Sequence, residues 1–569
     1  MRRALVALVA ASLVPTCTGE PAPRTTSTGP VPPAGSASSA PHVSAQPLDT
    51  TSRALARKVC ARTPHEVLLR TWRGVMLGRS GDIQLIPFEW AFVHGGLTHA
   101  TPFDYTQEVP VVIVGPGYVR PGVYDRAITL ADVAPTQAAM LGFPFRTPDG
   151  RAQTQALLPP DERPRPRLLV TLVWDSGGWD VLDRWPDAWP YLRSLGDAAA
   201  VFTRVTVGAS PTNTPVAHAT IGTGTFPMRH GFVDEYVRVN EALQKPNANG
   251  PAFLVDPTLA DVYDRSEGNR PVVGAIATLA AHVMMMGHGS QWGGGDRDIA
   301  VTREKEFAPT AGAESEQWNL TAAMAPFYEL PAYVNDLPPV TRYVRQLDQA
   351  DGALDGKWRT NNIDRLAHGF DTPARTPYQT ALIREVIRRE GFGADDVPDL
   401  LYLNYKAIDT VGHLFSADSV EMRDAVTWQD EALRELVAFL DETVGEGRWV
   451  MTILADHGTQ RDPAVSGAFL IDIGRLEEAV VAAFDDDDDV PLVEKVRPTE
   501  IWLDVAELDD NGYTLVDVSA RLMRLTQSDT VKANGQTQPG RASAEVFSAA
   551  LPSTLLSHLP CLPEASAGA

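Results

Sequence analysis

Three short apolar segments that each end close to an aspartate constrain the fold of this chain more than any other feature. Residues 167–174 run directly into Asp175, and two later segments precede Asp409 and Asp456 in the same way. The later segments are residues 400–405 and 449–454. Apolar runs of this length are typical of strands buried in a parallel sheet, and such sheets place functional side chains at the carboxyl ends of their strands. We therefore predict an α/β fold that gathers these acids at one edge of a mostly parallel sheet.

The composition is that of a folded, acidic protein. The 569 residues include 44% hydrophobic and 21% charged residues, and the net charge is −23. This charge disfavours a nucleic-acid-binding protein, because such proteins meet phosphates with basic side chains. Three cysteines are too few for a disulfide-built scaffold, and no apolar run reaches the roughly 18 residues that span a bilayer. These values favour a large globular protein.

The first residues resemble an export signal. Two arginines precede a short apolar stretch, residues 4–14, and the signal is expected to span residues 1–17. Cys17 follows a sequence similar to a lipoprotein cleavage box, so the protein is expected to be either secreted or attached to the cell envelope through an acylated Cys17. Residues 18–52 are rich in Pro, Ser and Thr and are expected to form a flexible tether.

Two Asp-His pairs have spacings suited to metal binding. Asp409 and His413 are four residues apart, so a helix would place both side chains on one face. Asp456 and His457 are adjacent and are followed by Gly458, which suits a tight turn at the end of a strand. Either pair alone is more often a surface pair or a helix cap. Because both follow predicted buried strands, we interpret them together as metal ligands.

Thr214 stands directly before Pro215, which predicts a helix with Thr214 as its N-cap and proline at its first position. Taken alone, this pattern is most simply an ordinary helix cap. The N-terminus of a helix also attracts anions, through its free N–H groups and the helix dipole. A threonine hydroxyl at this position could attack phosphorus if a metal ion lowered its pKa.

Taken together, these segments resemble the alkaline phosphatase superfamily, in particular its nucleotide pyrophosphatase/phosphodiesterase and threonine-nucleophile branches. The resemblance rests on Asp175, Thr-Pro-Val-Ala-His-Ala-Thr-Ile-Gly-Thr-Gly at 214–224, Pro-Met-Arg-His-Gly at 227–231, residues 409–421 and Ala-Asp-His-Gly at 455–458. It implies a three-layer α/β/α sandwich with a mostly parallel central sheet. It also implies that residues 160–232 and 372–565 form the core and that residues 233–371 are cap insertions.

The superfamily completes its first metal site with a histidine downstream of the Asp-His-Gly motif, and only His558 lies downstream here. The usual surroundings of that histidine stand instead near the amino terminus, at His99 and the Thr-Pro-Phe-Asp-Tyr that follows it. We therefore predict a circular permutation in which residues 53–155, usually the closing segment of the catalytic domain, precede the rest. The alternative is an independent amino-terminal domain. Permutation would bring Cys60 and Cys561 close together, either as a disulfide or as two unpaired thiols.

The resemblance implies two metal ions and a threonine nucleophile. The ligands of one ion are His99, Asp409 and His413, and those of the other are Asp175, Asp456, His457 and Thr214. This mixture of nitrogen and oxygen ligands suits Zn²⁺, with other divalent metals as alternatives. Thr214 would attack a small-molecule phosphate ester in line and carry the phosphoryl group as a phosphothreonine intermediate. His218 and His230 are interpreted as structural residues rather than ligands.

Two departures from the superfamily pattern bear on the substrate. Monoesterases with a threonine nucleophile carry a Lys-x-Arg pair, whereas residues 277–288 contain neither basic residue. Asp234 and Glu235 stand where a phosphate-binding asparagine is expected, and carboxylates would repel a phosphate unless they held a cation. The first departure favours a phosphodiesterase or nucleotide pyrophosphatase over an alkaline phosphomonoesterase. The second leaves open a non-catalytic, metal-bearing binding protein of the cell envelope.

Overall fold

The computed structural model describes residues 48–93, 97–245, 251–279, 284–287, 297–303, 317–366, 369–485, 490–533 and 535–563. The expected export signal, Cys17 and most of the expected tether lie outside these ranges. Within them, no helix combines the length and the hydropathy that a membrane crossing requires.

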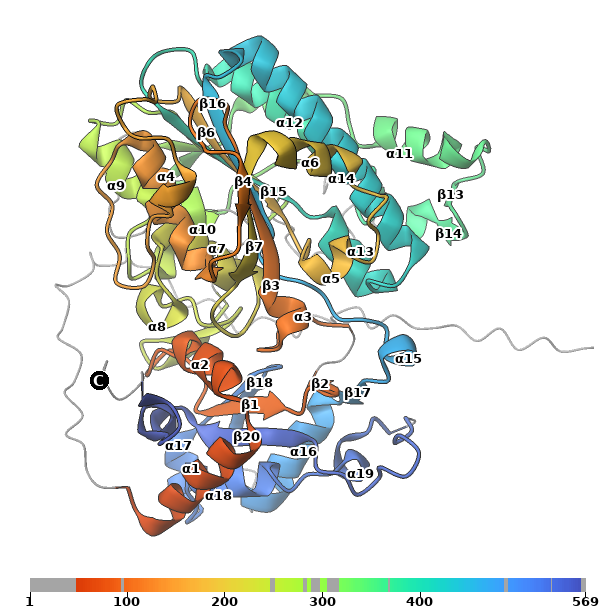
Figure 1. Ribbon diagram of the computed structural model, residues 1–569. Helices are drawn as coiled ribbons and strands as arrows, with labels where there is room; N and C mark the ends of the chain where they lie inside the picture. The colour runs from red at the N-terminus through yellow and green to blue at the C-terminus, as the bar shows by residue number, and fades with distance from the viewer. Residues whose placement is uncertain are drawn as a thin grey trace, which may run out of the picture. The chain divides into compact units, whose positions relative to one another are not determined.

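A large sheet forms the centre of the fold (Figure 1), in the order β12-β11-β10-β15-β6-β16-β3-β7-β4, with β5 also paired to β7. Its strands are β3 (Glu108–Val114), β4 (Gly122–Tyr124), β5 (Ile128–Thr129), β6 (Leu168–Trp174), β7 (Ala199–Thr206), β10 (Val273–Ile276), β11 (Asp298–Val301), β12 (Tyr328–Glu329), β15 (Asp399–Tyr405) and β16 (Trp449–Leu454). Strand β6 lies between β15 and β16 and is parallel to both. Only β3 runs against its neighbours among these described strands. The predicted α/β fold with a mostly parallel sheet is confirmed.

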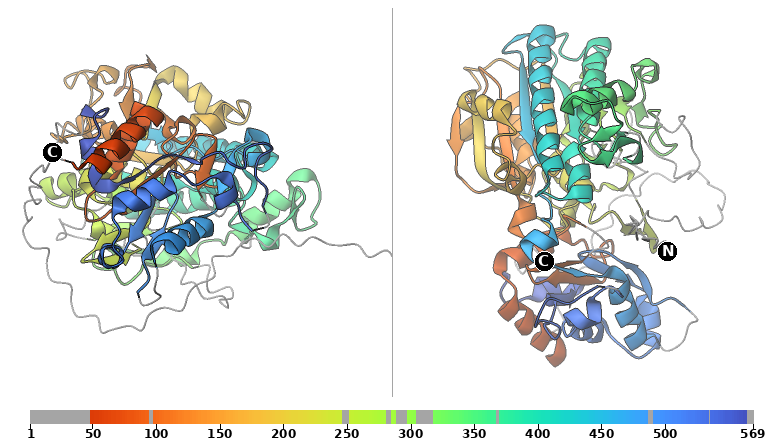
Figure 2. Two further views of the ribbon diagram at one scale, coloured as in Figure 1. Left: turned by 90° about the horizontal axis from the view of Figure 1, so that it is seen from below. Right: turned by 90° about the vertical axis from the view of Figure 1, so that its right-hand side faces the viewer.

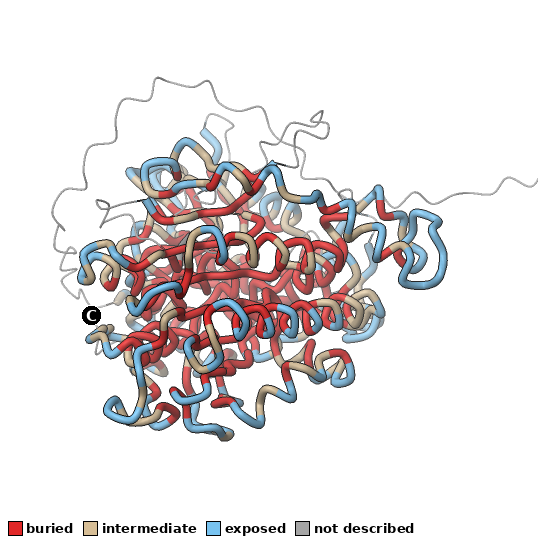
Figure 3. Tube along the Cα trace, turned by 90° about the horizontal axis from the view of Figure 1, so that it is seen from above, coloured by how far each residue is buried: buried red, intermediate tan, exposed pale blue. Residues whose placement is uncertain are grey.

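Helices cover both faces of this sheet because its central strands are apolar on both sides. Alternate residues of β6 divide between two hydrophobic clusters: Leu168, Val170 and Leu172 lie in one, and Leu169 and Val173 in the other. The first cluster includes α12 (Arg375–Glu390) and α14 (Val420–Leu440), which pack side by side (Figure 2). The second includes α4 (Val133–Leu141), α7 (Thr214–Thr223) and α9 (Leu259–Ser266). Figure 3 shows the buried residues concentrated in the interior and the exposed ones in the outer segments.

A smaller antiparallel sheet combines the two ends of the described chain. Its order is β18-β19-β1-β20, with β1 (Ile83–Pro87) between β19 (Glu500–Leu503) and β20 (Phe547–Pro552), and β18 (Val493–Val496) at the edge. Helices α1 (Thr50–Arg62), α16 (Ile473–Phe484) and α18 (Leu515–Leu522) share its hydrophobic cluster. The amino-terminal segment is therefore part of a core that the carboxyl-terminal segment also builds.

The remaining described elements are short. They are α2 (His65–Gly74), α3 (Asp104–Gln107), α5 (Trp179–Leu182), α6 (Pro190–Leu195), α8 (Pro227–His230), α10 (Met284–Gly287), α11 (Thr341–Asp348), α13 (Ala407–Phe415), α15 (Pro463–Ser466), α17 (Val505–Asp510), α19 (Gln527–Thr530), β2 (Ala91–Val93), β8 (Val237–Val239), β9 (Ala242–Gln244), β13 (Lys357–Trp358), β14 (Asn361–Asn362) and β17 (Phe469–Ile471). Strands β2 and β17 pair in parallel, so the two ends of the chain meet here as well.

The structure corrects the expected division of the chain. Residues 233–371 are not cap insertions alone, because they supply β10, β11 and β12 to the large sheet. That prediction is wrong because β11 and β12, with four and two residues, give only a weak pattern, and because the apolar run at residues 272–277, which contains β10, belongs to the sheet and not to a cap. Residues 372–565 also contribute three strands to the small sheet. Helix α1 begins at Thr50, inside the segment 18–52 that was expected to be a tether.

Arg497 connects the small sheet to the acid pair at 234–235. It lies in the turn between β18 and β19, with Nε 3.2 Å from Asp234 Oδ1 and Nη2 2.9 Å from Glu235 Oε2. The Asp234 side chain is fully buried. The two carboxylates therefore hold a cation, and that cation is a guanidinium from a distant part of the sequence.

A covalent bond joins the same two ends of the chain. Cys60 in α1 forms a disulfide with Cys561, across a sequence separation of 501 residues. Of the two alternatives for these cysteines, the structure shows the disulfide.

We predict that replacing Cys60 and Cys561 together with serine lowers the free energy of unfolding by about 2–5 kcal/mol, because the unfolded chain gains freedom when a long loop is opened. Urea unfolding of the variant and of the wild type, each with and without reductant, measures this difference. Reductant should destabilise only the wild type. Equal stability of both proteins under oxidising conditions would contradict the prediction.

We predict that Arg497→Met lowers the free energy of unfolding by about 3–5 kcal/mol, because it leaves a buried carboxylate without its cation. Adding Asp234→Asn and Glu235→Gln should recover much of the loss. Arg475→Met is the matched control, since it breaks the exposed pair with Glu478 and should cost under about 1 kcal/mol. If urea unfolding gave the same decrease in the free energy of unfolding for Arg497→Met and Arg475→Met, the buried pair would have no special role.

Candidate functional site

Three buried carboxylates meet at one edge of the large sheet. Asp175 follows β6 and Asp456 lies two residues beyond β16, while Asp409 lies in α13, directly after β15. Each is at most 2% exposed. Because β15, β6 and β16 are adjacent and parallel, their carboxyl ends bring the acids together, as the apolar segments predicted.

The backbone beside these acids is tightly constrained. Ser176 has a positive φ of 61°, its N–H donates to Asp456 Oδ1 at 3.1 Å, and its hydroxyl donates to Asp409 Oδ1 at 2.8 Å. A left-handed conformation is costly for a non-glycine residue and persists where the surroundings enforce it. A Cβ atom on Gly458 would lie 2.1 Å from the Tyr105 carbonyl oxygen, so only glycine fits there. Ser176 was not singled out from the sequence.

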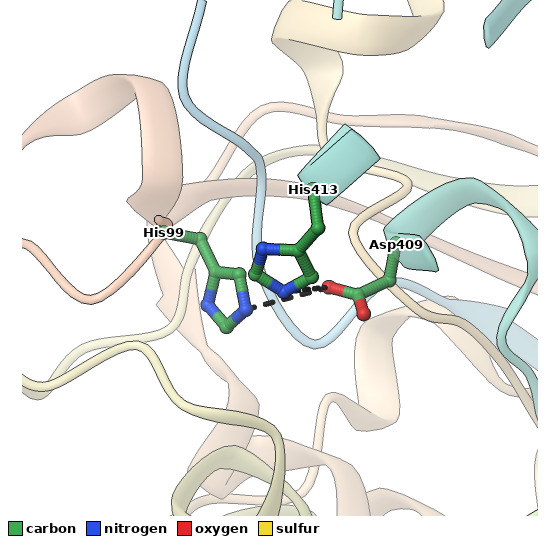
Figure 4. A group of neighbouring side chains, drawn as sticks. All are labelled: His99, Asp409 and His413. Atoms are coloured by element: carbon green, nitrogen blue, oxygen red, sulfur yellow. Dashed lines mark ion pairs between the residues drawn. The ribbon is translucent and has the colours of Figure 1, made fainter. Parts of the chain in front are cut away.

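His99, Asp409 and His413 form one group of potential ligands (Figure 4). Helix α13 places Asp409 and His413 on one face, with His413 Nε2 3.5 Å from Asp409 Oδ1. His99 reaches the same carboxylate from the amino-terminal segment, with Nε2 3.3 Å from Oδ1. The donor atoms of the three residues all lie within 4.8 Å of one another. The structure therefore brings His99 to the two residues from which it is separated by more than three hundred positions.

Asp175, Asp456, His457 and Thr214 lie together beside this group. His457 Nε2 is 3.7 Å from Asp175 Oδ1, 3.3 Å from Asp456 Oδ2 and 3.3 Å from Thr214 Oγ1. Thr214 is the first residue of α7, with Asn213 as the N-cap, so the helix begins one residue earlier than predicted. All the residues predicted as ligands therefore gather at this edge of the sheet.

The hydrogen bonds of the histidines test whether metal ions fit here. Nδ1 of His99, His413 and His457 lies 2.7, 3.0 and 2.9 Å from the carbonyl oxygens of Thr212, Leu97 and Gly458, respectively. A carbonyl can only accept, so each Nδ1 carries the proton and a neutral ring leaves Nε2 with a lone pair. Each Nε2 faces a carboxylate oxygen, and this contact is favourable when a metal cation lies between the two atoms or when the ring is protonated and donates. This arrangement, with Nδ1 bound to a carbonyl, is typical of metal-binding histidines.

The other two histidines of the matched segments differ from each other. His218 is fully buried, with Nε2 3.2 Å from Asp456 Oδ2, and together with Asp175 and Asp456 it forms a further group of potential ligands. The sequence had suggested only a structural role for His218. His230 pairs with the Thr220 hydroxyl through Nε2 and accepts from the Phe232 N–H through Nδ1. Burial lowers the pKa of His230 to about 3, which keeps it neutral.

Lys406 is a member of the site that the sequence analysis missed. Its Nζ lies 2.9 Å from both Oδ atoms of Asp175, 2.7 Å from Asp409 Oδ2 and 3.1 Å from Thr214 Oγ1. The available signal was its position, directly after a buried strand and three residues before Asp409. The acid cluster therefore contains a cation of its own.

Burial and charge act in opposite directions on these acids. Burial, with a smaller contribution from the Asp456 charge, raises the pKa of Asp175 to about 7. Burial also opposes the ionisation of Asp409, but Lys406, His413 and His99 together outweigh it and hold the pKa of Asp409 well below its usual range. A further cation beside Asp175 would favour its charged form.

Basic side chains from other elements reach the two stretches that departed from the superfamily pattern. Arg375 in α12 donates from Nη2 to Thr278 Oγ1 at 2.9 Å, so a guanidinium contacts a stretch that lacks basic residues of its own. Part of residues 277–288 lies outside the described residues. Asp234, besides holding Arg497, accepts from Asn213 Nδ2 at 3.1 Å. The acid pair is therefore tied to the residue that precedes Thr214.

Comparison with curated proteins finds relatives that match part of the chain. It is 25% identical to the alkaline phosphatase PafA of Elizabethkingia meningoseptica over 350 residues, covering 52% of this chain and 60% of that protein. It is 21% identical to the alkaline phosphatase PhoV of Synechococcus elongatus, covering 55% of this chain and 62% of that protein. The chain is 23% identical to a calcium-transporting ATPase of Myroides odoratus, and the match covers 54% of this chain and 62% of that protein. The matches thus span about three fifths of the length of these relatives.

Solved structures and protein families give two further comparisons. A crystal structure of a PafA mutant aligns with 68% of this chain and 85% of its own, at 18% identity and a TM-score of 0.49. The family model described as Type I phosphodiesterase / nucleotide pyrophosphatase matches residues 169–529, more than half of the chain. This match confirms the resemblance that the motifs indicated: the chain belongs to the type I phosphodiesterase / nucleotide pyrophosphatase family.

Proposed function

We propose that this protein is a metal-dependent hydrolase of small phosphate esters with Thr214 as its nucleophile. The observation that carries the proposal is the position of Thr214 Oγ1, 3.3 Å from His457 Nε2 at the start of a buried helix and beside groups of potential ligands. His99, Asp409 and His413 would hold one Zn²⁺, and Asp175, Asp456, His457 and Thr214 the other. Bound zinc would act as a Lewis acid that stabilises charge on the reacting oxygens.

The residues of the chain itself would position the reaction. Thr214 Oγ1 would lose its proton and bond to phosphorus as the P–O bond to the leaving group breaks on the opposite side, and the leaving oxygen would take up a proton from solvent. A water molecule would then cleave the Oγ1–P bond, release the phosphoryl product and return a proton to Oγ1. The first N–H groups of α7 lack partners within the helix and favour an anion at this end. The carbonyl partners of Nδ1 fix the three imidazoles, so that Nε2 of each is directed at the acids.

The substrate proposal has two candidates within the same chemistry. The family description supports a phosphodiesterase or nucleotide pyrophosphatase. The relatives named as alkaline phosphatases, together with the cation beside Thr214, support a phosphomonoesterase. The alternative of a non-catalytic binding protein rested on Asp234 and Glu235. Since both hold Arg497, they are not free to repel a phosphate.

The proposal includes export of the protein. The disulfide between Cys60 and Cys561 supports it, because such bonds form and persist outside the reducing cytoplasm. Attachment to the envelope through Cys17 stays a prediction.

We also propose that the catalytic domain is circularly permuted. Strand β3 lies inside the large sheet between β16 and β7, and β1 lies between β19 and β20, although both come before the segment that the family model matches. These positions support a closing segment that is encoded first, rather than an independent amino-terminal domain. Rearrangement of this kind leaves core contacts intact when the original ends are close together.

We predict that Thr214→Ala lowers kcat/KM by about 1,000-fold or more, as expected for loss of a nucleophile. The assay compares p-nitrophenyl phosphate with bis-p-nitrophenyl phosphate at equal concentrations of zinc-loaded enzyme. Thr223→Ala, at the other end of α7, is the matched control and should stay within a few-fold of the wild type. Equal rates for the Thr214 variant and the wild type would rule out the proposed nucleophile.

We predict that His99→Ala removes about one zinc ion per chain, because it takes away one of the three ligands of that ion. Metal analysis after dialysis measures the content. His558→Ala is the control, since His558 is exposed and is the only histidine downstream of the Asp-His-Gly motif. Loss of zinc from the His558 variant and not from the His99 variant would contradict both the ligand assignment and the permutation.

A further inference from the structure

Lys406 is the cation beside Thr214, and the reaction proposed above gives it no contact with the substrate. Its side chain is 11% exposed, and its Nζ is held between Asp175 and Asp409 at 2.7–2.9 Å while lying 3.1 Å from Thr214 Oγ1. Two anchoring carboxylates prevent the long side chain from turning away. The structure therefore holds a positive charge beside the oxygen that would attack phosphorus.

The geometry of an ammonium group shows what this charge can contact. Lys406 has three N–H donors, of which the two carboxylates take two and Thr214 Oγ1 receives the third. When phosphorus is bonded to Oγ1, its non-bridging oxygens lie close to Oγ1. The third donor would then lie close to a phosphoryl oxygen.

Lys406 is better placed for this contact than the neighbouring buried arginine. Arg375 has Nη1 bonded to Thr410 Oγ1 at 2.8 Å and Nη2 bonded to Thr278 Oγ1 at 2.9 Å. Each terminal nitrogen thus has one threonine partner that holds the guanidinium in place. Among the lysines and arginines of the described ranges, it is Lys406 that donates a hydrogen bond to Thr214 Oγ1.

We propose that Lys406 is a catalytic residue that binds a non-bridging phosphoryl oxygen and favours phosphate monoesters over diesters. This inference rests on the proposed function and specifies its substrate class. Near neutral pH a monoester carries close to two negative charges on its phosphoryl oxygens, whereas a diester carries one. A fixed cation in a water-poor site attracts the more highly charged group more strongly.

The test compares Lys406→Met, Lys406→Arg and wild type, with Lys357→Met as the control for loss of an exposed lysine. For the zinc-loaded proteins it measures kcat/KM on p-nitrophenyl phosphate and on bis-p-nitrophenyl phosphate, zinc content, and the affinity for inorganic phosphate by calorimetry. For Lys406→Met we expect about a 100-fold loss on the monoester, as for removal of one donor to a developing charge, and about a 10-fold smaller loss on the diester. For the same variant, the affinity for inorganic phosphate should fall by about 10-fold or more, and the zinc content should be unchanged. Lys406→Arg should retain more of the monoester activity and more of the phosphate affinity than Lys406→Met.

Three results would overturn the inference: equal losses on both esters, unchanged affinity for phosphate, or loss of zinc from Lys406→Met. The last would show that the lysine organises the ligands instead of binding the substrate. If wild-type protein hydrolyses neither ester, the proposed function fails. In that case the phosphate-binding measurement still decides whether Lys406 binds the anion.

Discussion

The rest of the structure depends on the burial of three carboxylates at the ends of three adjacent parallel strands. Asp175, Asp409 and Asp456 are at most 2% exposed, and a buried carboxylate costs several kcal/mol unless cations and hydrogen-bond donors compensate for it. In this fold the compensating groups are the ammonium of Lys406, the N–H of Ser176 in its strained backbone conformation, and histidines whose Nε2 atoms face the acids. A cation bound there would satisfy the facing acceptors, and this is the physical basis for the proposed metal ions.

The need to compensate these buried carboxylates explains why segments that are distant in the sequence meet at the site. The amino-terminal part contributes His99 and β3, and it completes both sheets instead of forming a core of its own. The carboxyl-terminal part returns to pair β20 with β1 and is joined to α1 through Cys60 and Cys561. It also delivers Arg497 to the acid pair at 234–235. The small sheet therefore supports the site, because it positions a side chain that neutralises charge near Thr214.

The missing basic residues illustrate how far a linear pattern can mislead. The stretch at 277–288 has no lysine or arginine, yet Arg375 reaches Thr278 from α12. Lys406 lies beside Thr214 although the two are 192 positions apart. The charge of a site is set by which side chains converge in space, so the absence of a basic residue at one sequence position does not make the site neutral. For the same reason, Asp234 and Glu235 are the acidic members of an ion-paired cluster whose cation, Arg497, comes from a distant part of the chain.

The sequence by itself determined the central strands, the acids that follow them and the helix that begins near Thr214, because each depends on residues close together in the chain: an apolar run, a four-residue spacing or a proline after a threonine. It did not reveal β11 and β12, whose four and two residues give no clear pattern, and β10 was assigned to the cap although it lies in the apolar run at residues 272–277. Only the tertiary structure decided that His218 and Lys406 reach the acids and that Arg497 pairs with Asp234. Apart from the pair of Lys406 with Asp409, which are three residues apart, those contacts join residues that lie far apart along the chain. Their distances are fixed by the packing of sheets and helices, which no local pattern encodes.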